Sequence, residues 1–217
     1  MIDPEPLTGH DSALSARLWS ANADLAAQAL AHPFVTALGD GSLPRRAFAA
    51  FIAQDAFFLE SFARSYAFAL TRSPDTASLM TFADLLAGVK HELDLHATYA
   101  ARWEVDMGGV TPWPATLAYT EFLLATAATA DIGTVCAAMA PCMRLYAWLG
   151  SLLDPAAAGP YGEWVLTYAD PAFEALARRL EGLVDEWTAD EGREARTYRR
   201  AMALELGLFE AAVHPVS

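Results

Sequence analysis

A cysteine inside an apolar helical stretch is the first residue of this sequence whose chemistry could matter. The stretch AAMAPCMRLYAWLG places Cys142 directly after Pro141, with Tyr146 four residues further on. A thiol can be a small apolar filler of a helical core, or it can ionise and act as a nucleophile. The stretch leaves both interpretations open, because the outcome depends on the acids and aromatic side chains that other segments bring to it.

Two acidic residues stand on otherwise apolar segments. Asp55 interrupts AAFIAQDAFFLESF, where Phe58 follows it, and Glu205 interrupts AMALELGLFEAA. Such a carboxylate can lie on an exposed edge or bond a neighbouring helix, or it can form the polar wall of a pocket. Tyrosines in apolar helices present the same choice, because a buried hydroxyl needs a hydrogen-bond partner. They are Tyr119, Tyr146 and Tyr168.

The segment VKHELDLH places Glu92 and His96 four residues apart, on one face of a helix. Glutamate and histidine at helical spacing build carboxylate-bridged di-iron centres in helical bundles. Those centres use the motif Glu-x-x-His twice, and the sequence does not contain it. The pattern therefore favours an ordinary pair, with one histidine in a tertiary hydrogen bond, over half of a metal site.

The elements that would position these residues are helices. Asp11 can cap a helix over about 11–31, HPFVTALGDGSLP supplies turn residues, and Pro44 begins the next helix. Asp75 caps another helix that runs to about residue 106. Further helices are expected after Pro114 and over 130–153, 161–169, 171–188 and 190–213. Since strand-like alternation and linkers are both missing from the sequence, it predicts one all-α domain, residues 1–217, of seven or eight helices.

Charge and composition restrict the partners. The formal net charge is −13, and Lys and Arg form no cluster, so we expect neither nucleic acid nor membrane as a partner. The chain is nevertheless 54% hydrophobic, with six Trp, eleven Phe and seven Tyr. This apolar content predicts surface buried in a homo-oligomer (a dimer or tetramer), an aromatic-lined pocket, or both.

The cysteines and the N-terminus indicate a compartment. Cys136 and Cys142 are six residues apart on one predicted helix, about 9 Å along its axis and on different faces, so they cannot form a disulfide. Unpaired thiols, and an N-terminus without signal-peptide features, predict a cytoplasmic protein. The apolar window FLLATAATADIGTVCAAMAP is interrupted by Asp131, which argues against a membrane span.

Four segments, in order, resemble the TenA family (thiaminase II, aminopyrimidine aminohydrolase). HPFVTALGDGSLPRRAFAAFIAQDAFFL is similar to the family's N-terminal signature of His-Pro-Phe, a Gly-x-Gly turn, Leu-Pro and an aromatic helix carrying Gln-Asp. MAPCMRLYAWLG resembles its cysteine helix, YGEWVLTYADPAF its Trp-x-x-x-Tyr segment, and AMALELGLFEAA its terminal acid helix. The resemblance covers residues from about 15 to 213 and implies the haem-oxygenase-like all-helical fold.

The resemblance also implies an activity: hydrolysis of 4-amino-5-aminomethyl-2-methylpyrimidine to the hydroxymethyl pyrimidine, which salvages degraded thiamine. It implies that Cys142 is the nucleophile, Glu205 the acid and base beside it, and Asp55 the anchor for the polar edge of the aminopyrimidine. The pocket would be lined by Tyr119, Tyr146 and Tyr168. The small pyrimidine is the implied partner, and neither a metal ion nor an organic cofactor is implied.

Two features qualify the resemblance. Phe58 stands where many family members have a second tyrosine, which removes one hydroxyl from the pocket. The segment PCMRLYAWLG is closer to a branch from plants and some bacteria that is associated with aminopyrimidine and formylaminopyrimidine hydrolysis. We therefore expect salvage hydrolysis rather than thiamine cleavage. Arg144 is expected to point away from the pocket, and Cys136 to be a core residue.

Two other functions are compatible with parts of the sequence. A di-iron oxidase with the same fold would use Glu92 and His96, and stoichiometric iron or manganese in the purified protein would identify it. A non-catalytic pyrimidine-binding or regulatory protein would not need the thiol. A Cys142→Ser variant that hydrolyses the aminomethyl pyrimidine as fast as wild type would remove Cys142 as nucleophile.

Overall fold

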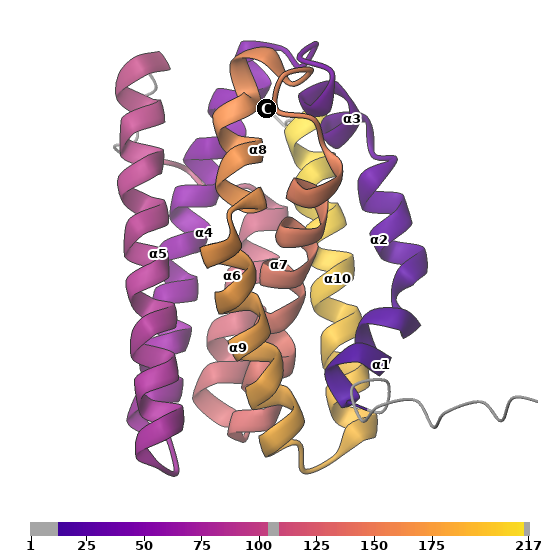
Figure 1. Ribbon diagram of the computed structural model, residues 1–217. Helices are drawn as coiled ribbons and strands as arrows, with labels where there is room; N and C mark the ends of the chain where they lie inside the picture. The colour runs from indigo at the N-terminus through magenta and orange to yellow at the C-terminus, as the bar shows by residue number, and fades with distance from the viewer. Residues whose placement is uncertain (1–12, 104–108, 215–217) are drawn as a thin grey trace, which may run out of the picture.

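The computed structural model describes residues 13–103 and 109–214, which form ten α-helices, one short 3-10 helix and no strand. The helices are α1 (Leu14–Ala21), α2 (Ala23–Leu30), α3 (Pro33–Gly39), α4 (Arg45–Thr71), α5 (Thr76–Trp103), α6 (Pro114–Thr129), α7 (Ile132–Leu152), the 3-10 helix η1 (Gly159–Tyr161), α8 (Gly162–Ala169), α9 (Pro171–Trp187) and α10 (Glu191–Val213). The prediction of an all-α fold is confirmed. The longer helices run up and down side by side, and α1 to α3 lie along the outside of α10 (Figure 1).

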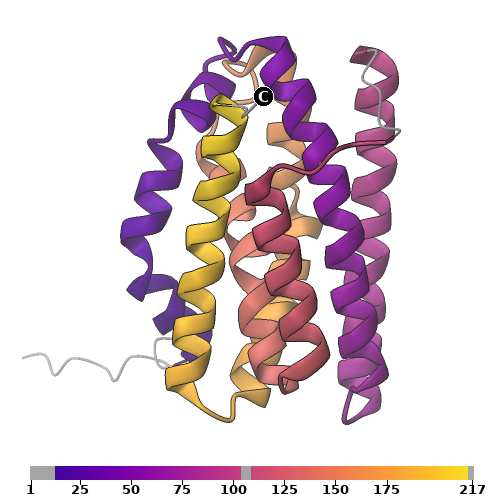
Figure 2. The same ribbon diagram turned by 180° about the vertical axis from the view of Figure 1, so that it is seen from behind.

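Helix α7 occupies the centre of the bundle. It packs against α8 and α9 on the face seen in Figure 1, and against α10 and α6 behind (Figure 2). Most of its residues are buried, as the apolar sequence requires. It is the one helix of the described residues that is long and apolar enough to cross a membrane, and 78% of its most apolar window is buried inside the protein. A buried core helix has the same composition, so this feature agrees with a helix at the centre of a bundle.

The segment predicted as one helix over 11–31 is two helices. Asn22 separates α1 from α2, with a non-helical backbone at φ −113° and ψ 16°. Its side chain donates to the carbonyl of Leu18 at 2.8 Å and accepts from Arg199 at 3.2 Å. Asparagine competes with the helical backbone for hydrogen bonds in this way, which explains the break. The predicted cap Asp11 lies outside the described residues.

A helix also forms where the sequence analysis expected only a turn. Helix α3 begins with Pro33 at its first position, which suits the fixed φ of proline. His32 caps it, because its Nδ1 accepts from the backbone N–H of Phe34 at 3.2 Å. The predicted cap Asp75 is confirmed, since it accepts from the N–H of Ser78 at 2.7 Å. The helix expected after Pro114 is also present, and Pro114 is its first residue.

One glycine sets how closely α8 approaches α7. A Cβ added at Gly150 would lie 2.5 Å from the backbone carbon of Tyr168, closer than two such atoms can pack. The absence of a side chain at Gly150 therefore lets the end of α8 lie directly on α7. This contact holds Tyr168 over the helix that carries Cys142.

Candidate active site

The thiol of Cys142 faces a carboxyl group from another helix. Cys142 on α7 is half-buried, while Pro141 and Met143 beside it are buried. Glu205 on α10 is 1% exposed, and its Oε1 accepts from the hydroxyl of Tyr119 on α6 at 2.7 Å. Its Oε2 is buried and has no hydrogen bond from any described residue. That oxygen is free to exchange a proton with the thiol or with a ligand.

Burial of Glu205 and Cys142 in this enclosure, the space between α4, α5, α6, α7, α8 and α10, changes which of the two groups carries a proton. Burial and the nearby Asp55 raise the pKa of Glu205 from 4.5 to about 8, although the hydrogen bond from Tyr119 opposes the change. Burial, followed by the charges of Glu205 and Glu92, raises the pKa of the Cys142 thiol well above its usual value. The resting protein therefore holds a neutral thiol. A thiolate would form only by transfer of the proton to a base, and Glu205 is the base beside it.

A second pair is formed by Asp55 on α4 and His96 on α5. Asp55 Oδ2 lies 2.7 Å from His96 Nε2, and both side chains are almost fully buried. His96 Nδ1 lies 2.8 Å from the carbonyl oxygen of Glu92, which can only accept a hydrogen bond. Burial lowers the pKa of His96, but the hydrogen bond and charge of Asp55 outweigh it and raise the pKa to about 9. His96 is thus an imidazolium, and its two ring N–H groups donate to Asp55 Oδ2 and to the carbonyl oxygen of Glu92.

Glu92 also belongs to the site, although the sequence analysis gave it no catalytic or substrate-binding role and favoured an ordinary pair with His96 over half of a metal site. Its Oε1 accepts from the hydroxyl of Tyr168 on α8 at 2.5 Å. Burial and the charge of Asp55 raise its pKa from 4.5 to about 7. Both ring nitrogens of His96 are engaged, and within the described residues no group of three or more His, Cys, Asp or Glu side chains is arranged to hold a metal ion.

Aromatic rings enclose the polar groups. Phe58 lies 4.8 Å from Tyr119, ring centre to ring centre, and Tyr146 lies 4.9 Å from Tyr168. Burial raises the pKa of Tyr146 well above its usual value, and the charges of Glu205, Asp55, Cys142 and Glu92 raise it further. These interactions place Tyr146 beside the polar groups. Four helices thus bring aromatic surfaces to one enclosure.

Tyr66 is a further neighbour that the sequence analysis missed. Its hydroxyl is buried without a hydrogen-bond partner, and its pKa is raised by burial and by the nearby Cys142, Cys136 and Glu92. Helical spacing offered a signal, because Asp55 and Tyr66 are eleven residues apart, about three turns, on one face of α4. The site that the structure assembles is therefore larger than the predicted one by Tyr66, Glu92 and His96.

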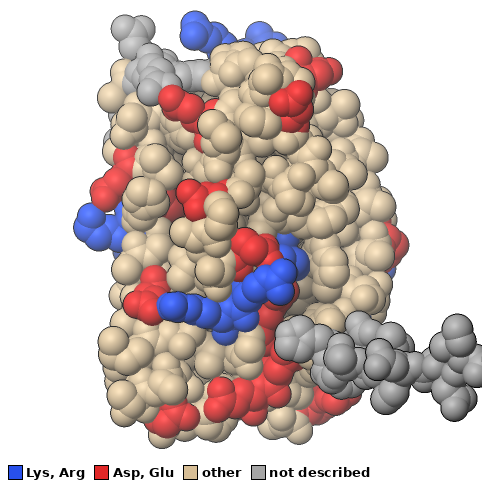
Figure 3. All heavy atoms as spheres, in the orientation of Figure 1, with Lys and Arg blue, Asp and Glu red and all other residues tan. Residues whose placement is uncertain are grey.

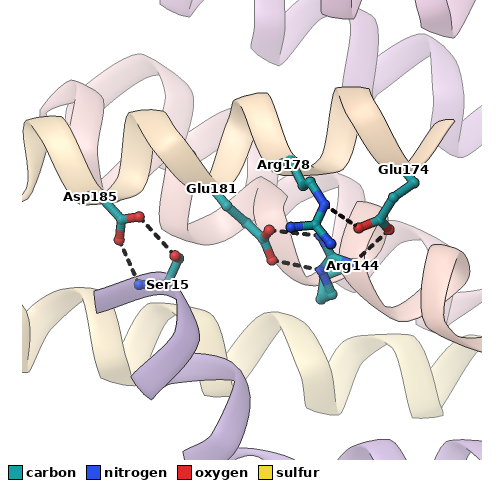
Figure 4. A network of polar contacts seen from close by, with 6 residues as sticks. All are labelled: Ser15, Arg144, Glu174, Arg178, Glu181 and Asp185. Carbon is teal, nitrogen blue, oxygen red and sulfur yellow. Dashed lines mark hydrogen bonds and ion pairs between the residues drawn. The ribbon is translucent and has the colours of Figure 1, made fainter. Parts of the chain in front are cut away.

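Arg144 points away from the thiol, as predicted. Its Nε and Nη2 donate to Glu181 at 2.6 and 2.7 Å, and its Nη1 donates to Glu174 at 2.8 Å (Figure 4). Arg178 also bonds Glu174, at 2.7 Å. This network ties α7 to α9. Figure 3 shows that basic and acidic side chains lie side by side on the lower half of the face drawn there. Both cysteines are free, and Cys136 is completely buried.

Two hollows approach the enclosure from the surface. The larger, about 810 Å³, lies over the Arg144 network. Tyr168 is the aromatic ring of the enclosure that lines it. The smaller, about 320 Å³, lies between α5, α7, α8 and α9 and reaches Glu92. We regard the smaller one as the more relevant to the chemistry, since a carboxyl group of the enclosure lies in its wall.

Comparison with known proteins shows the family of this chain. Residues 19–212 match the model of the TENA/THI-4/PQQC family. The chain is 36% identical over 163 residues to the aminopyrimidine aminohydrolase of Halalkalibacterium halodurans, covering 71% of this chain and 73% of that one. It is 33% identical to the mitochondrial bifunctional TH2 protein of Arabidopsis thaliana, covering 93% of this chain and 37% of the relative. It is 31% identical to the thiamine biosynthesis multifunctional protein ThiED of Corynebacterium efficiens, over 96% of this chain and 29% of the relative. The chain thus spans about a third of the length of the last two curated relatives.

Solved structures agree with the fold. A TenA family transcription regulator from Silicibacter sp. TM1040 has a TM-score of 0.87 and 25% identity, covering 93% of this chain and 97% of that one. A domain with a heme oxygenase-like fold from Shewanella denitrificans has a TM-score of 0.68 at 12% identity, covering 92% and 91% of the two chains. The prediction of a haem-oxygenase-like helical fold is therefore confirmed.

Proposed function

We propose, because the chain belongs to the TENA/THI-4/PQQC family, that it hydrolyses pyrimidines derived from thiamine. The substrate is 4-amino-5-aminomethyl-2-methylpyrimidine or its N-formyl derivative, and the product is the hydroxymethyl pyrimidine. The name of the Halalkalibacterium relative, aminopyrimidine aminohydrolase, supports this reaction class. The protein is accordingly a thiaminase II-like hydrolase that salvages the pyrimidine.

One observation carries the proposal: a free thiol meets a buried carboxyl group inside an aromatic enclosure. Glu205 has one oxygen held by Tyr119 and one oxygen without a partner, next to Cys142. Flat rings on several sides suit a flat heterocycle and exclude water. Asp55, oriented by His96 at 2.7 Å, supplies an acceptor for the amidine edge of an aminopyrimidine.

The proposed reaction begins with proton transfer from Cys142 to Glu205 and addition of the sulfur to the pyrimidine ring. The new S–C bond makes the ring electron-rich, and the C–N bond to the exocyclic amine then breaks, with its electron pair and one proton from a carboxyl group of the site going to the nitrogen, which leaves as ammonia. Water adds its hydroxyl to the exocyclic carbon and returns a proton to that carboxyl group, the sulfur leaves the ring, and Glu205 returns the thiol proton to the sulfur. Tyr119 would hold Glu205 in place, while Phe58, Tyr146 and Tyr168 line the ring. These roles need no metal ion and no organic cofactor.

Product analysis by mass spectrometry tests the proposal. The purified protein is incubated with the aminomethyl pyrimidine, with its N-formyl derivative and with thiamine, and the hydroxymethyl pyrimidine is measured. We expect turnover of one or both of the first two, and loss of about 100-fold or more in a Cys142→Ser variant. A matched Cys136→Ser variant should keep wild-type activity. Turnover of none of the three, or unchanged turnover by Cys142→Ser, would overturn the assignment.

We further propose that the protein acts in the cytoplasm as a homo-oligomer. Exposed apolar side chains support association, and they include Phe68, Leu79, Met80, Leu117, Leu152 and Leu166. Light scattering coupled to gel filtration would show a dimer or tetramer, and a monomer at micromolar concentration would contradict this.

A further inference from the structure

The site contains a second pairing of a carboxyl group with a tyrosine. Glu205 is bonded by Tyr119 at 2.7 Å, and Glu92 is bonded by Tyr168 at 2.5 Å. The two glutamates belong to α10 and α5, which lie on opposite sides of the bundle with α4, α6 and α7 between them (Figures 1 and 2). A flat ring held between them would therefore present a different edge to each carboxyl group.

The surroundings of the two glutamates differ in accessible space. Glu205 and Tyr119 are 1% and 0% exposed, so their side of the enclosure is closed. Glu92 is only half-buried and lies in the wall of the 320 Å³ pocket, whose other walls include Leu85, Val89, Met143, Phe173 and Leu176. A group that is released from the substrate needs room to depart. The structure offers that room beside Glu92.

The reaction also needs two separate proton transfers. One moves the thiol proton, and Glu205 lies next to that thiol. The other must reach the leaving nitrogen, because an amide or amine anion is a very poor leaving group. Glu92 is placed for the second transfer, since Tyr168 fixes its orientation while leaving Oε2 without a bond from that hydroxyl.

We propose that the pocket beside Glu92 receives the leaving amine or formamide, and that Glu92 is the catalytic acid for its departure. This inference rests on the proposed function. The C–N bond breaks, its electron pair stays on nitrogen, and the Glu92 carboxyl proton moves to that nitrogen. Water then adds to the exocyclic carbon and gives one proton to the Glu92 carboxylate, which restores the acid. The sum is R–CH2–NH2 plus water giving R–CH2–OH plus ammonia, with no oxidant or reductant.

A small-acid rescue experiment tests the assignment. Glu92→Gln should lower kcat on the aminomethyl pyrimidine by about 100-fold or more, which is typical of a lost general acid. In Glu92→Ala, added formate should raise kcat at least about tenfold above the value without formate, because the pocket gives a small acid access to the position of the missing carboxyl group. Asp94→Asn, an exposed change on the same helix, is the matched control and should behave as wild type. Full activity of Glu92→Gln, or a folded Glu92→Ala that formate does not rescue, would overturn the assignment.

A second variant keeps the test valid if the Glu92 variants do not fold. Tyr168→Phe keeps the ring but removes a hydrogen bond that lowers the pKa of Glu92. In a plot of kcat against pH, the loss of activity that accompanies deprotonation of Glu92 should therefore move to higher pH. An unmoved limb would contradict a catalytic role for Glu92. Unchanged activity of Cys142→Ser would instead refute the proposed function. If Cys142→Ser is inactive while Glu92→Gln is fully active, only the role of Glu92 is refuted.

Discussion

Replacing His96 by glutamine should flatten the pH dependence of folding stability. The buried pair of Asp55 and His96 is 2.7 Å apart, and it raises the pKa of His96 from 6.5 to about 9 against the effect of burial. The difference between these values, at about 1.36 kcal/mol for each pH unit, corresponds to about 3 kcal/mol. Breaking a buried ion pair costs a similar amount, about 3–5 kcal/mol.

The sign follows from which state binds the proton more tightly. The folded protein has the higher pKa at His96, so the stabilisation is fully present below pH 6.5. It is lost progressively as the pH rises from 6.5 to about 9. Glu92 and Glu205 also have raised pKa values, to about 7 and about 8, and they add a decline of the same sign. The difference between wild type and His96→Gln isolates the histidine from most of that decline.

Urea denaturation at several pH values across this window provides the assay. The free energy of unfolding of wild type minus that of His96→Gln should shrink by about 3 kcal/mol from the bottom of the window to its top. His91→Gln, a change at an exposed histidine on the same helix, should keep the slope of wild type. A difference that is constant with pH would show that His96 is not protonated in the folded protein, and the reasoning from its two acceptors would be wrong.

Three further experiments probe the thiol of Cys142, the carboxyl group of Glu205 and the close contact between Gly150 and the end of α8. Iodoacetamide should alkylate Cys142 at neutral pH more slowly than a free cysteine, because burial and Glu205 raise the pKa of the thiol; intact-protein mass spectrometry gives the rate. Tyr119→Phe should cost about 1–3 kcal/mol in urea denaturation by leaving Glu205 Oε1 unpaired. It should also raise the pKa of Glu205, because the lost hydrogen bond lowers that pKa, and a pH profile of kcat should show the corresponding shift to higher pH. Gly150→Ala should cost about 1–3 kcal/mol and lower the melting temperature, because its Cβ would lie 2.5 Å from the Tyr168 backbone. An equal melting temperature would refute the close approach of α8.

The helices could be predicted from the sequence because their signals are local. The cap at Asp75, the helix start near Pro114 and the apolar periodicity are confirmed. The two differences are local as well, and both have signals in the sequence. Asn22 bonds back to Leu18 and ends α1, and Pro33 after His32 is a proper helix start.

The pairings inside the site could not be predicted from spacing. Asp55 and His96 are 41 residues apart, and Glu92 and Tyr168 are 76 apart, so only the packing of α4, α5 and α8 brings them together. Helical spacing did show that Glu92 and His96 share a face and favoured a tertiary hydrogen bond for one histidine over half of a metal site, but it could not name Asp55 as the partner of His96. The structure resolves the choice by giving each residue a different partner. The catalytic role of Cys142 stays a prediction that its variants will test.

The charges of the site explain why Glu92 and Glu205 keep their protons up to pH values near neutrality. Asp55, Glu92 and Glu205 share one enclosure with one imidazolium, so full ionisation would leave two uncompensated negative charges in a poorly solvated space. Burial and mutual repulsion therefore keep protons on the two glutamates at pH values where they would be lost in water. Formation of a thiolate at Cys142 would add a further negative charge, which burial and the charges of Glu205, Glu92 and Asp55 oppose. An aminopyrimidine that binds as a cation would remove this opposition, so substrate and nucleophile would become charged together.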